Sequence, residues 1–479
     1  MRSLRWSVSG HPRLRRATIG AAGLGIATAT TIALAWPSEA ATQPISAARV
    51  VSVSSIAALK TAIGNAQAGD RIELADGTYS VSSSINIAKS NLTVAAQHVG
   101  KAKLTGGATF TFGTVTAVGI QGFSFAGSKG LSVPTSAGHV KISRNVFQLS
   151  SSGAWLSVAG DDAEVDHNTF QHRTSEGVFL QITGPGSHDM AKHTWIHHNY
   201  FFDHQFSGAN GGESIRLGLS GRQHGSAQAI VEYNLFEKAD GDSEAISVKS
   251  SDNIIRYNTL RNSKGSIVLR HGNRNRVEGN IELGGTSGIR FYGNDHVIVN
   301  NVVQNSTGQA IEVGGGEIKD DTDNTTAHEA ADRCLVAFNT LVNDRAAPIK
   351  VGGGKAFPPD RITFANNIVS GPSGSAATVS QGTNLAWSGN IISGVSRGSI
   401  PSSGATSVNP KLTTDAGGVF RLSSGSPAID ASVGTYPQIA LDLDLQARTG
   451  KFDVGADEFN ASGTVRLALT TANVGPNAA

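Results

Sequence analysis

The chain of 479 residues has one cysteine, Cys334, and only two methionines, while aromatic residues make up 6% and charged residues 16%. One cysteine cannot form an intrachain disulfide, so no disulfide framework supports the fold. No long stretch combines charge with helical spacing, which argues against a helical bundle. Glycine is abundant, at 57 residues, and Ser, Thr, Val, Ile and Asn are frequent. This composition predicts an all-β chain that is rich in turns.

Residues 1–40 have the pattern of an export signal. Five arginines precede an apolar run over about 17–35, and the small residues at 38–40 resemble a cleavage site. The adjacent Arg15 and Arg16 resemble a twin-arginine signal, which predicts a secreted protein without stable membrane association. An uncleaved membrane anchor is the alternative, although Gly and Thr dilute the apolar run.

Export changes the charge of the working protein. The whole chain has a formal net charge of +2, but residues 1–40 hold five Arg and one Glu. The remainder therefore has 34 basic and 36 acidic residues. The basic isoelectric point belongs to the signal, and we expect no nucleic-acid partner. The oligomeric state cannot be read from the sequence.

A repeat centred on asparagine runs through most of the chain. Short apolar-alternating runs flank each Asn, and successive asparagines are 21 to 38 residues apart, with a base period near 22. Such a period predicts a stacked β-solenoid, with left-handed turns at Asn and amide ladders between coils. The ten positions are Asn145, Asn168, Asn199, Asn234, Asn258, Asn280, Asn301, Asn339, Asn367 and Asn390.

One β-helical domain is expected over residues 45–460, because no linker divides this range. Helical apolar spacing at 55–67 predicts a helix that caps the first coil and covers an exposed sheet edge. The segments FRLSSGSPAID and FDVGADEF resemble closing strands near the other end. Residues 461–479 are rich in Ala, Thr and Asn, which predicts a loosely ordered tail.

Lys249 and Arg270 have nearly the same place in consecutive repeats. Lys249 precedes its repeat Asn by nine residues and Arg270 by ten, so stacked strands about 4.8 Å apart would bring them together. A one-residue slip normally turns a side chain to the other face, so we expect a turn to absorb the offset. His271, at offset nine, competes for the position facing Lys249. A base candidate beside a fixed cation is typical of proton abstraction next to a carboxylate.

Two acidic residues lie just before Lys249 in the sequence. Asp242 and Glu244 alternate, which would place both on one face of a strand, where a cation between them would relieve their repulsion. Oxygen ligands of this kind suit Ca²⁺. A solvated acidic turn is the alternative.

The segments GDSEAISVKS, RHGN and NGGESIRLG resemble polysaccharide lyase family 6, which includes alginate lyases and chondroitinase B. The resemblance extends from AALKTAIGNAQAGDRIELADGTY to GADEF and implies a single right-handed parallel β-helix. It also implies Lys249 as the base and Arg270 as the acid or charge stabiliser. Asn210, Asp242 and Glu244 match the family's Ca²⁺ ligands, although a Glu is common where Asp242 stands.

The implied activity is a Ca²⁺-assisted β-elimination on an anionic uronate polysaccharide, with alginate the leading substrate. Further candidates for holding the sugar chain are His271, Arg290 and Tyr292. His197 and His198 resemble a metal pair, yet neighbours on a strand face opposite ways, which favours a scaffold role. The segment 317–332 is expected to be a long loop that could overhang the groove or hold a second Ca²⁺.

Three alternative functions remain open from the sequence. One is a lyase for dermatan or chondroitin sulfate. The second is a glycoside hydrolase on the same scaffold, with Asp240, Asp242 and Glu244 as paired carboxylates. The third is a non-catalytic carbohydrate-binding β-helix, which would have no need of a base and a cation beside acids.

Overall fold

The computed structural model describes residues 49–206, 208, 210–344 and 347–479. The described residues from 49 onward form one compact unit. The predicted signal at 1–40 lies outside the described residues. Within the part that is described, no helix is long and apolar enough to cross a membrane.

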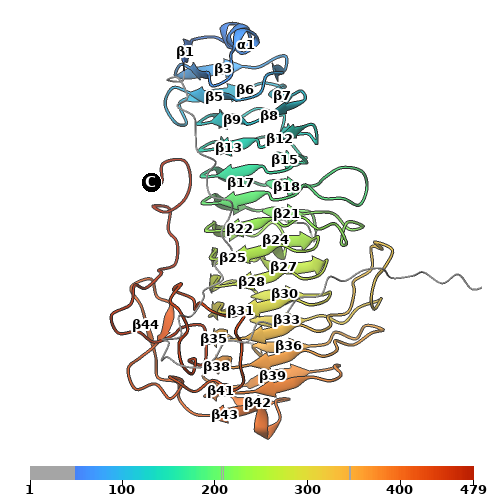
Figure 1. Cartoon of the computed structure of the whole chain (residues 1–479), viewed down its shortest axis with the longest axis vertical. Helices are drawn as coiled ribbons and strands as arrows, with labels where there is room; N and C mark the ends of the chain where they lie inside the picture. Colours follow the sequence, from blue (N-terminus) through green and yellow to red (C-terminus); the bar gives the residue numbers. More distant parts are fainter. Residues whose placement is uncertain (1–48, 207, 209, 345–346) are drawn as a thin grey trace, which may run out of the picture. The chain divides into compact units, whose positions relative to one another are not determined.

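Stacked coils of the chain form three parallel sheets, each of which takes one strand from successive coils (Figure 1). Sheets 1 and 2 contain 14 strands each and sheet 3 contains 11. The prediction of an all-β parallel solenoid is confirmed. A solenoid forms here because short apolar strands alternate with turns at a nearly constant period, so each coil buries its inward side chains on the next.

The strands of the three sheets follow the order of the coils. Sheet 1 contains β1 (Val50–Val53), β2 (Arg71–Leu74), β5 (Leu92–Ala96), β9 (Val118–Gln121), β13 (Lys141–Ser143), β16 (Glu164–Asp166), β19 (Trp195–His197), β22 (Ile230–Glu232), β25 (Ile254–Arg256), β28 (Arg276–Glu278), β31 (Val297–Val299), β34 (Leu335–Ala337), β37 (Thr363–Ala365) and β40 (Ala386–Ser388). Sheet 2 contains β3 (Gly77–Ser80), β6 (Ala102–Thr105), β10 (Ser124–Phe125), β14 (Val146–Phe147), β17 (Thr169–Arg173), β20 (Tyr200–His204), β23 (Leu235–Ala239), β26 (Thr259–Arg261), β29 (Ile281–Leu283), β32 (Val302–Gln304), β35 (Thr340–Val342), β38 (Ile368–Ser370), β41 (Asn390–Ser393) and β43 (Ala405–Ser407).

Sheet 3 carries the residues singled out by the sequence. It contains β11 (Leu131–Val133), β15 (Leu156–Val158), β18 (Leu180–Ile182), β21 (Ile215–Leu217), β24 (Glu244–Lys249), β27 (Ser266–His271), β30 (Ile289–Phe291), β33 (Ile311–Val313), β36 (Ile349–Val351), β39 (Ser375–Val379) and β42 (Ser396–Gly398). The remaining elements are the pairs β4 (Ile85–Ile87) with β7 (Phe110–Phe112), β8 (Val115–Thr116) with β12 (Ala137–Gly138), and β44 (Leu412–Thr414) with β45 (Phe420–Leu422), and the 3₁₀ helix η1 (Ser402–Gly404).

Helix α1 (Ile56–Asn65) caps the first coil as predicted (Figure 1). It begins after Ser55, whose hydroxyl accepts a hydrogen bond from the Ala58 amide at 3.1 Å and so satisfies a free N–H of the first turn. Leu59 and Ile63, four residues apart, are buried on the same face. The helix thereby covers the apolar end of the solenoid.

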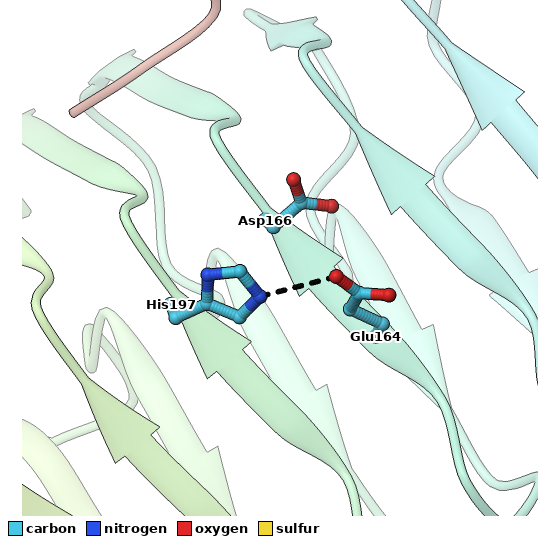
Figure 2. A group of neighbouring side chains, drawn as sticks. All are labelled: Glu164, Asp166 and His197. Carbon is cyan, nitrogen blue, oxygen red and sulfur yellow. Dashed lines mark hydrogen bonds and ion pairs between the residues drawn. The ribbon is translucent and has the colours of Figure 1, made fainter. Parts of the chain in front are cut away.

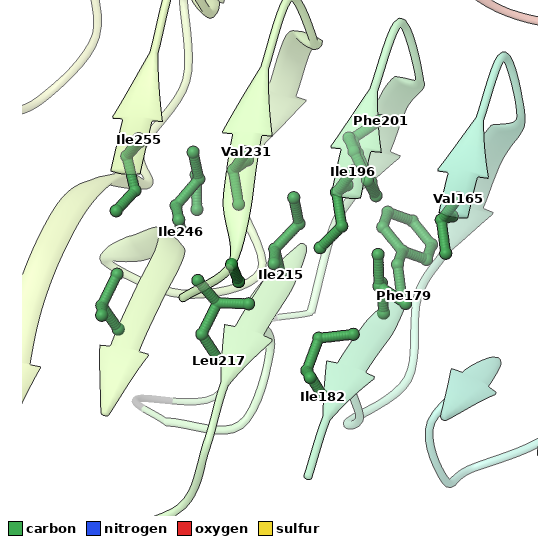
Figure 3. Close-up of a cluster of buried hydrophobic side chains, with 14 of the residues drawn as sticks. Val165, Phe179, Ile182, Ile196, Phe201, Ile215, Leu217, Val231, Ile246 and Ile255 are labelled. Carbon is green, nitrogen blue, oxygen red and sulfur yellow. The ribbon is translucent and has the colours of Figure 1, made fainter. Parts of the chain in front are cut away.

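The core is a set of apolar columns, with one side chain per coil. Figure 3 shows Val165, Ile196, Val231 and Ile255 of sheet 1 facing side chains from sheet 3 across the interior. In sheet 2 the phenylalanine rings stack in parallel at about one coil spacing; for example, Phe147 and Phe170 have centroids 4.7 Å apart. This packing holds each coil in register with the next.

The asparagines form a continuous buried ladder along the solenoid. The Oδ1 of Asn234 accepts hydrogen bonds from the backbone N–H and Nδ2 of Asn199, at 2.9 and 3.0 Å, and its own Nδ2 donates to Asn258. The predicted amide ladder is confirmed. The predicted left-handed backbone at these asparagines is wrong, because positive φ falls on the residue before, such as His198 (53°) and Tyr233 (52°). The Asn is therefore selected by its amide, and the turn itself precedes it.

The carboxyl-terminal region wraps back over the solenoid. Phe420–Leu422 of the predicted closing segment is a strand, β45, but the segment 452–459 contains no strand. The tail at 461–479 packs on earlier coils, where the Leu469 amide donates to Thr259 Oγ1 at 2.9 Å and the Gly475 amide to the His198 carbonyl at 2.9 Å. These hydrogen bonds hold the tail against β26 and against the turn before Asn199.

Candidate functional site

Strand β24 presents Lys249 on the outer face of sheet 3. Ile246 and Val248 point into the core, so the alternation of a strand directs Ser247 and Lys249 outward. Outward does not mean exposed here, since the Lys249 side chain is only 9% accessible. Neighbouring coils and loops therefore surround the amine.

The pairing of β24 with β27 is irregular next to Lys249. Val248 is paired with Leu269, but Lys249 is paired with His271, so the register skips Arg270. The one-residue offset is thus absorbed by a bulge within the strand pair, and the expectation that a turn absorbs it is wrong. A bulge can redirect one side chain while the strands remain paired. Arg270 turns toward Glu244, and its Nη1 donates to Glu244 Oε1 at 2.8 Å.

Glu213 is the nearest acidic partner of Lys249. The Lys249 Nζ lies 3.5 Å from Glu213 Oε1, and Arg216 also bonds this carboxylate, with Nε 2.8 Å from Oε1. Burial would raise the pKa of Glu213, but the hydrogen bonds and charge of Arg216, together with Lys249, outweigh it and lower that pKa. Burial lowers the pKa of Lys249, and the charges of Arg216 and Arg270 add to this effect against the attraction of Glu213 and Glu244.

Glu244 lies between two guanidinium groups. Its Oε1 accepts from Arg270 and, at 3.0 Å, from Arg290 Nη2, while its Oε2 accepts from the Ser247 hydroxyl. The Nε atoms of Arg270 and Arg290 are buried and have no hydrogen-bond partner among the described residues. The protein therefore leaves part of the hydrogen-bonding capacity of both cations unused.

Asp242 has a different set of partners. Its Oδ2 accepts the backbone N–H groups of Gly211 and Gly212, at 2.8 and 3.4 Å, and its Oδ1 lies 3.3 Å from the Ser243 hydroxyl. Among the described residues no basic side chain forms an ion pair with it. Asn210 is exposed in the turn that supplies these amides. Carboxylate and amide oxygens are ligand types that suit a hard cation such as Ca²⁺, and the Glu244 carboxylate is also bonded to two arginines.

His328 belongs to the site, although no sequence motif singled it out. Its ring stacks on Tyr292, with centroids 4.5 Å apart and an interplanar angle of 28°, and on His271, at 5.3 Å and 7°. His271 itself is only 3% exposed, so its ring lies within the wall of the site. Burial, the neighbouring His328 and the nearby cations lower the pKa of His271 to about 3. No local pattern could have placed His328, which lies within the long acidic loop at 317–330.

A small polar pocket opens beside Arg290 on sheet 3. Its lining includes the hydroxyls of Ser243, Ser266 and Ser287 and the carboxylate of Glu312. Its volume of about 30 Å³ is close to that of one water molecule, so it is a small polar recess beside Arg290 and is too small for a whole sugar unit.

A second acidic group lies on sheet 1 and includes His197. Glu164, Asp166 and His197 could together hold a metal ion, and Figure 2 shows them on the adjacent strands β16 and β19. The ammonium of Lys141, however, lies 2.7 Å from Glu164 Oε1 and 3.5 Å from Asp166 Oδ1. A cation is therefore already present between the carboxylates. His198 does not join this group of metal donors, and its backbone turns at positive φ.

A third acidic group lies in the carboxyl-terminal region. Asp442, Asp444 and Asp457 are close enough to hold an ion, but Arg421 Nη1 lies 2.9 Å from Asp444 Oδ1. This arrangement is an ion-pair network that ties the carboxyl-terminal segments together.

The chain is a parallel β-solenoid that carries a buried lysine, two arginines and carboxylates on one sheet. The family model described as chondroitinase B matches residues 53–376, more than half of the chain. The protein therefore belongs to the chondroitinase B family, which is polysaccharide lyase family 6.

Solved structures support this assignment. The family 6 alginate lyase AlyGC is 25% identical with a TM-score of 0.71, and the match covers 78% of this chain and 55% of that one. The chain thus spans about 55% of the length of AlyGC. A mannuronic acid-specific family 6 lyase from human gut microbiota is 24% identical, with a TM-score of 0.67 and coverage of 75% and 91%, and this likeness concerns the fold.

A family 6 alginate lyase in complex with a trisaccharide is 20% identical, with a TM-score of 0.70 and coverage of 90% and 96%, and this likeness concerns the fold. No curated protein matches the chain significantly.

Proposed function

We propose that this protein is a secreted lyase that cleaves an anionic uronate polysaccharide, with alginate as the leading substrate, by β-elimination. The observation that carries the proposal is the buried Lys249, whose pKa is lowered, on the strand next to Arg270. Family membership supports the reaction class, and the relatives described as alginate lyases support the substrate. The export pattern of residues 1–40 supports secretion.

Lys249 is assigned the role of the base. It must be neutral to accept the C5 proton of a uronate, and burial favours the neutral amine. The amine lies 3.5 Å from Glu213, which holds it in place while Arg216 balances the charge of that carboxylate. Neutral Lys249 takes the proton, the C4–O4 bond breaks, and an unsaturated uronate remains at the new non-reducing end.

Arg270 and Arg290 are assigned to the negative charge of the substrate. Their positive charges, on side chains that are 29% and 27% exposed, can attract the carboxylate whose α-carbon loses its proton, which stabilises the enolate-like transition state. Arg270 or a water can then protonate the leaving oxygen. A Ca²⁺ ion held by Asn210, Asp242 and Glu244 would add charge neutralisation at the same carboxylate. Tyr292 remains a candidate for holding the sugar chain. His271 also remains a candidate, but only 3% of it is exposed, so its contact with a sugar would be small.

A lyase for dermatan or chondroitin sulfate is the second candidate, favoured by the description of the matching family model. The hydrolase alternative is less well supported. The carboxylates that a hydrolase would use are already bonded within the protein: Asp240 accepts hydrogen bonds from the Lys264 backbone N–H and from Gln205, and Glu244 is held by two arginines. A hydrolase would also leave the buried pair of Lys249 and Glu213 without a role.

The test is incubation of the mature protein with alginate and, separately, with dermatan sulfate, while ultraviolet absorbance and reducing ends are followed. Elimination produces a conjugated double bond that absorbs in the ultraviolet, whereas hydrolysis produces reducing ends without it. We expect absorbance to rise on alginate. A rise only on dermatan sulfate would select the second candidate, and no rise on any uronate polymer would refute the lyase.

A further inference from the structure

The ring of His328 is inserted between two aromatic rings that belong to neighbouring coils. It stacks at 4.5 Å on Tyr292, which follows β30, and at 5.3 Å on His271, the last residue of β27. His328 is 36 positions from Tyr292 and 57 positions from His271 in the sequence. The stack therefore fastens a distant loop to the coils that carry the candidate base and its cation.

The loop that carries His328, residues 317–330, is tied to a second loop at residues 218–226. The side-chain Nε2 of Gln223 donates to Asp321 Oδ2 at 2.5 Å and also to the Thr325 backbone carbonyl. The His224 amide donates to Asn324 Oδ1 at 3.0 Å. Asp321 is buried and also accepts from the Thr325 amide, so it holds both loops at once. We name these two connected loops the arch.

The two loops start from strands that are not neighbours. The first follows β21 and the second follows β33, while β24, β27 and β30 lie between them in sheet 3. Four strand spacings of about 4.8 Å separate the starting points by roughly 19 Å. The contacts between the loops therefore bridge the carboxyl ends of the three intervening strands, where Lys249 and His271 lie.

His271 is contacted by both halves of the arch. The Ser220 hydroxyl of the first loop lies 3.3 Å from His271 Nε2, and His328 of the second loop covers its ring. His271 is in turn paired with Lys249 across the two strands. The first loop also begins against the base, since a Cβ on Gly218 would lie 2.7 Å from the Lys249 carbonyl oxygen. A displacement of either loop is thus transmitted to the strand pair that holds Lys249.

The charges around His328 favour a structural role for the ring. Its Nδ1 is 3.3 Å from Glu317 Oε2, and Lys355 bonds the same carboxylate. Burial and the charge of Arg270 lower the pKa of His328, which keeps the ring neutral at neutral pH. A neutral ring between His271 and Tyr292 brings no added charge to the cationic site.

We propose that the arch is a specificity element that forms one wall of the substrate groove beside Lys249, and that His328 is its positioning residue. The inference rests on the proposed function and extends it to a substrate subsite. The sugar unit bound next to the base packs against the wall that Tyr292 and His328 form. Loss of the central ring separates the arch from His271, which weakens substrate binding more than it slows the chemical step.

Three variants test this role. His328→Ala removes the ring, His328→Phe keeps a flat ring, and Gln223→Ala loosens the loop at 218–226. The control is Thr326→Ala, which changes an exposed residue of the loop at 317–330. We expect KM on the cleaved polymer to rise about tenfold in His328→Ala and in Gln223→Ala, with kcat changed less than about threefold. His328→Phe and Thr326→Ala should stay near the original protein. An unchanged KM in His328→Ala, or a folded His328→Phe as defective as His328→Ala, would overturn the proposal.

Limited proteolysis provides a readout that does not depend on activity. Cleavage within 317–330 should accelerate about tenfold in His328→Ala and remain slow in His328→Phe, because the ring stack holds the loop closed. If the original protein cleaves no uronate polymer, the proposed function fails while this measurement still tests the position of His328. Equal protection of the loop in both variants contradicts the positioning role even when the enzyme is active.

Discussion

Lys249 faces His271, and not Arg270, across the paired strands β24 and β27. The bulge that produces this pairing lets two consecutive residues of β27 serve the site in different ways. Arg270 turns to Glu244, and His271 is covered by the arch. A regular strand could not place both, because consecutive side chains would point to opposite faces. The irregularity is therefore what permits a base, a cation and a wall to meet on one face of sheet 3.

Replacement of Lys249 by Ala tests the assigned base. General-base catalysis contributes roughly 10²- to 10⁴-fold, so we expect kcat to fall by at least about 100-fold while the protein still binds the polymer. Ultraviolet absorbance measures the rate, and co-sedimentation with the polymer measures binding. Lys264→Ala, which changes an exposed lysine after β26, is the matched control and should keep full activity. Full activity in Lys249→Ala would show that another group removes the proton.

The dependence of the rate on pH should report Lys249. Because the base acts as the neutral amine, kcat/KM should rise with pH and level off above the pKa of Lys249, which burial lowers from its ordinary value of 10.5. The negative charge of Glu213 raises this pKa, so Glu213→Gln should move the rising limb to lower pH. A shift to higher pH in Glu213→Gln would contradict the assigned pairing.

The cation site can be tested by removal and return of metal. We expect chelation to lower the rate and added Ca²⁺ to restore it, since Asn210, Asp242 and Glu244 are oxygen donors. Asp242→Asn should weaken the response to Ca²⁺, whereas Asp252→Asn, which changes a carboxylate paired with Arg274 near the surface, should not. If chelation leaves the rate unchanged, then Arg270 and Arg290 alone neutralise the substrate carboxylate.

The solenoid could be predicted from the sequence because its information is local and repeated. A period near 22 and a column of asparagines specify stacked coils, and the ladder from Asn199 through Asn234 to Asn258 has the hydrogen bonds expected. The same repeat also predicted that Lys249 and Arg270 occupy positions on consecutive coils that differ by only one residue. Helix α1 could also be predicted, since its apolar spacing and the Ser55 cap lie within a dozen residues.

The rest depends on contacts that no local pattern records. Leu269 and His271 carry no signal that the register will skip Arg270 between them. The hydrogen bonds from Gln223 and His224 to the loop at 317–330 join residues about a hundred positions apart, so neither loop sequence predicts its partner. His328 lies at the site only because the fold stacks its ring on Tyr292 and His271. Tertiary packing likewise left 452–459 without a strand despite its apolar alternation.

Glu282 is an acidic side chain in an apolar column, and it gives the last prediction. In sheet 2 it is paired with Leu260 and Val303, which both belong to the core. Its Oε1 has no hydrogen-bond partner among the described residues. Burial, with the nearby charge of Asp344, raises the pKa of Glu282 to about 8. At neutral pH the folded protein therefore holds a proton there that the unfolded chain, with a Glu pKa of about 4.3, has already released.

Since the folded state binds more protons than the unfolded state between about pH 4 and pH 8, stability from this group falls as pH rises through that window. Glu282→Met replaces the carboxyl with an apolar group of similar length. We expect this variant to be more stable at pH 8 by about 1–3 kcal/mol, with a smaller gain at pH 5. Urea denaturation at both pH values measures the difference, and Asp323→Asn, an exposed change, should leave the original pH dependence intact. If Glu282→Met lost as much stability between pH 5 and pH 8 as the original protein does, Glu282 would already be ionised in the folded core.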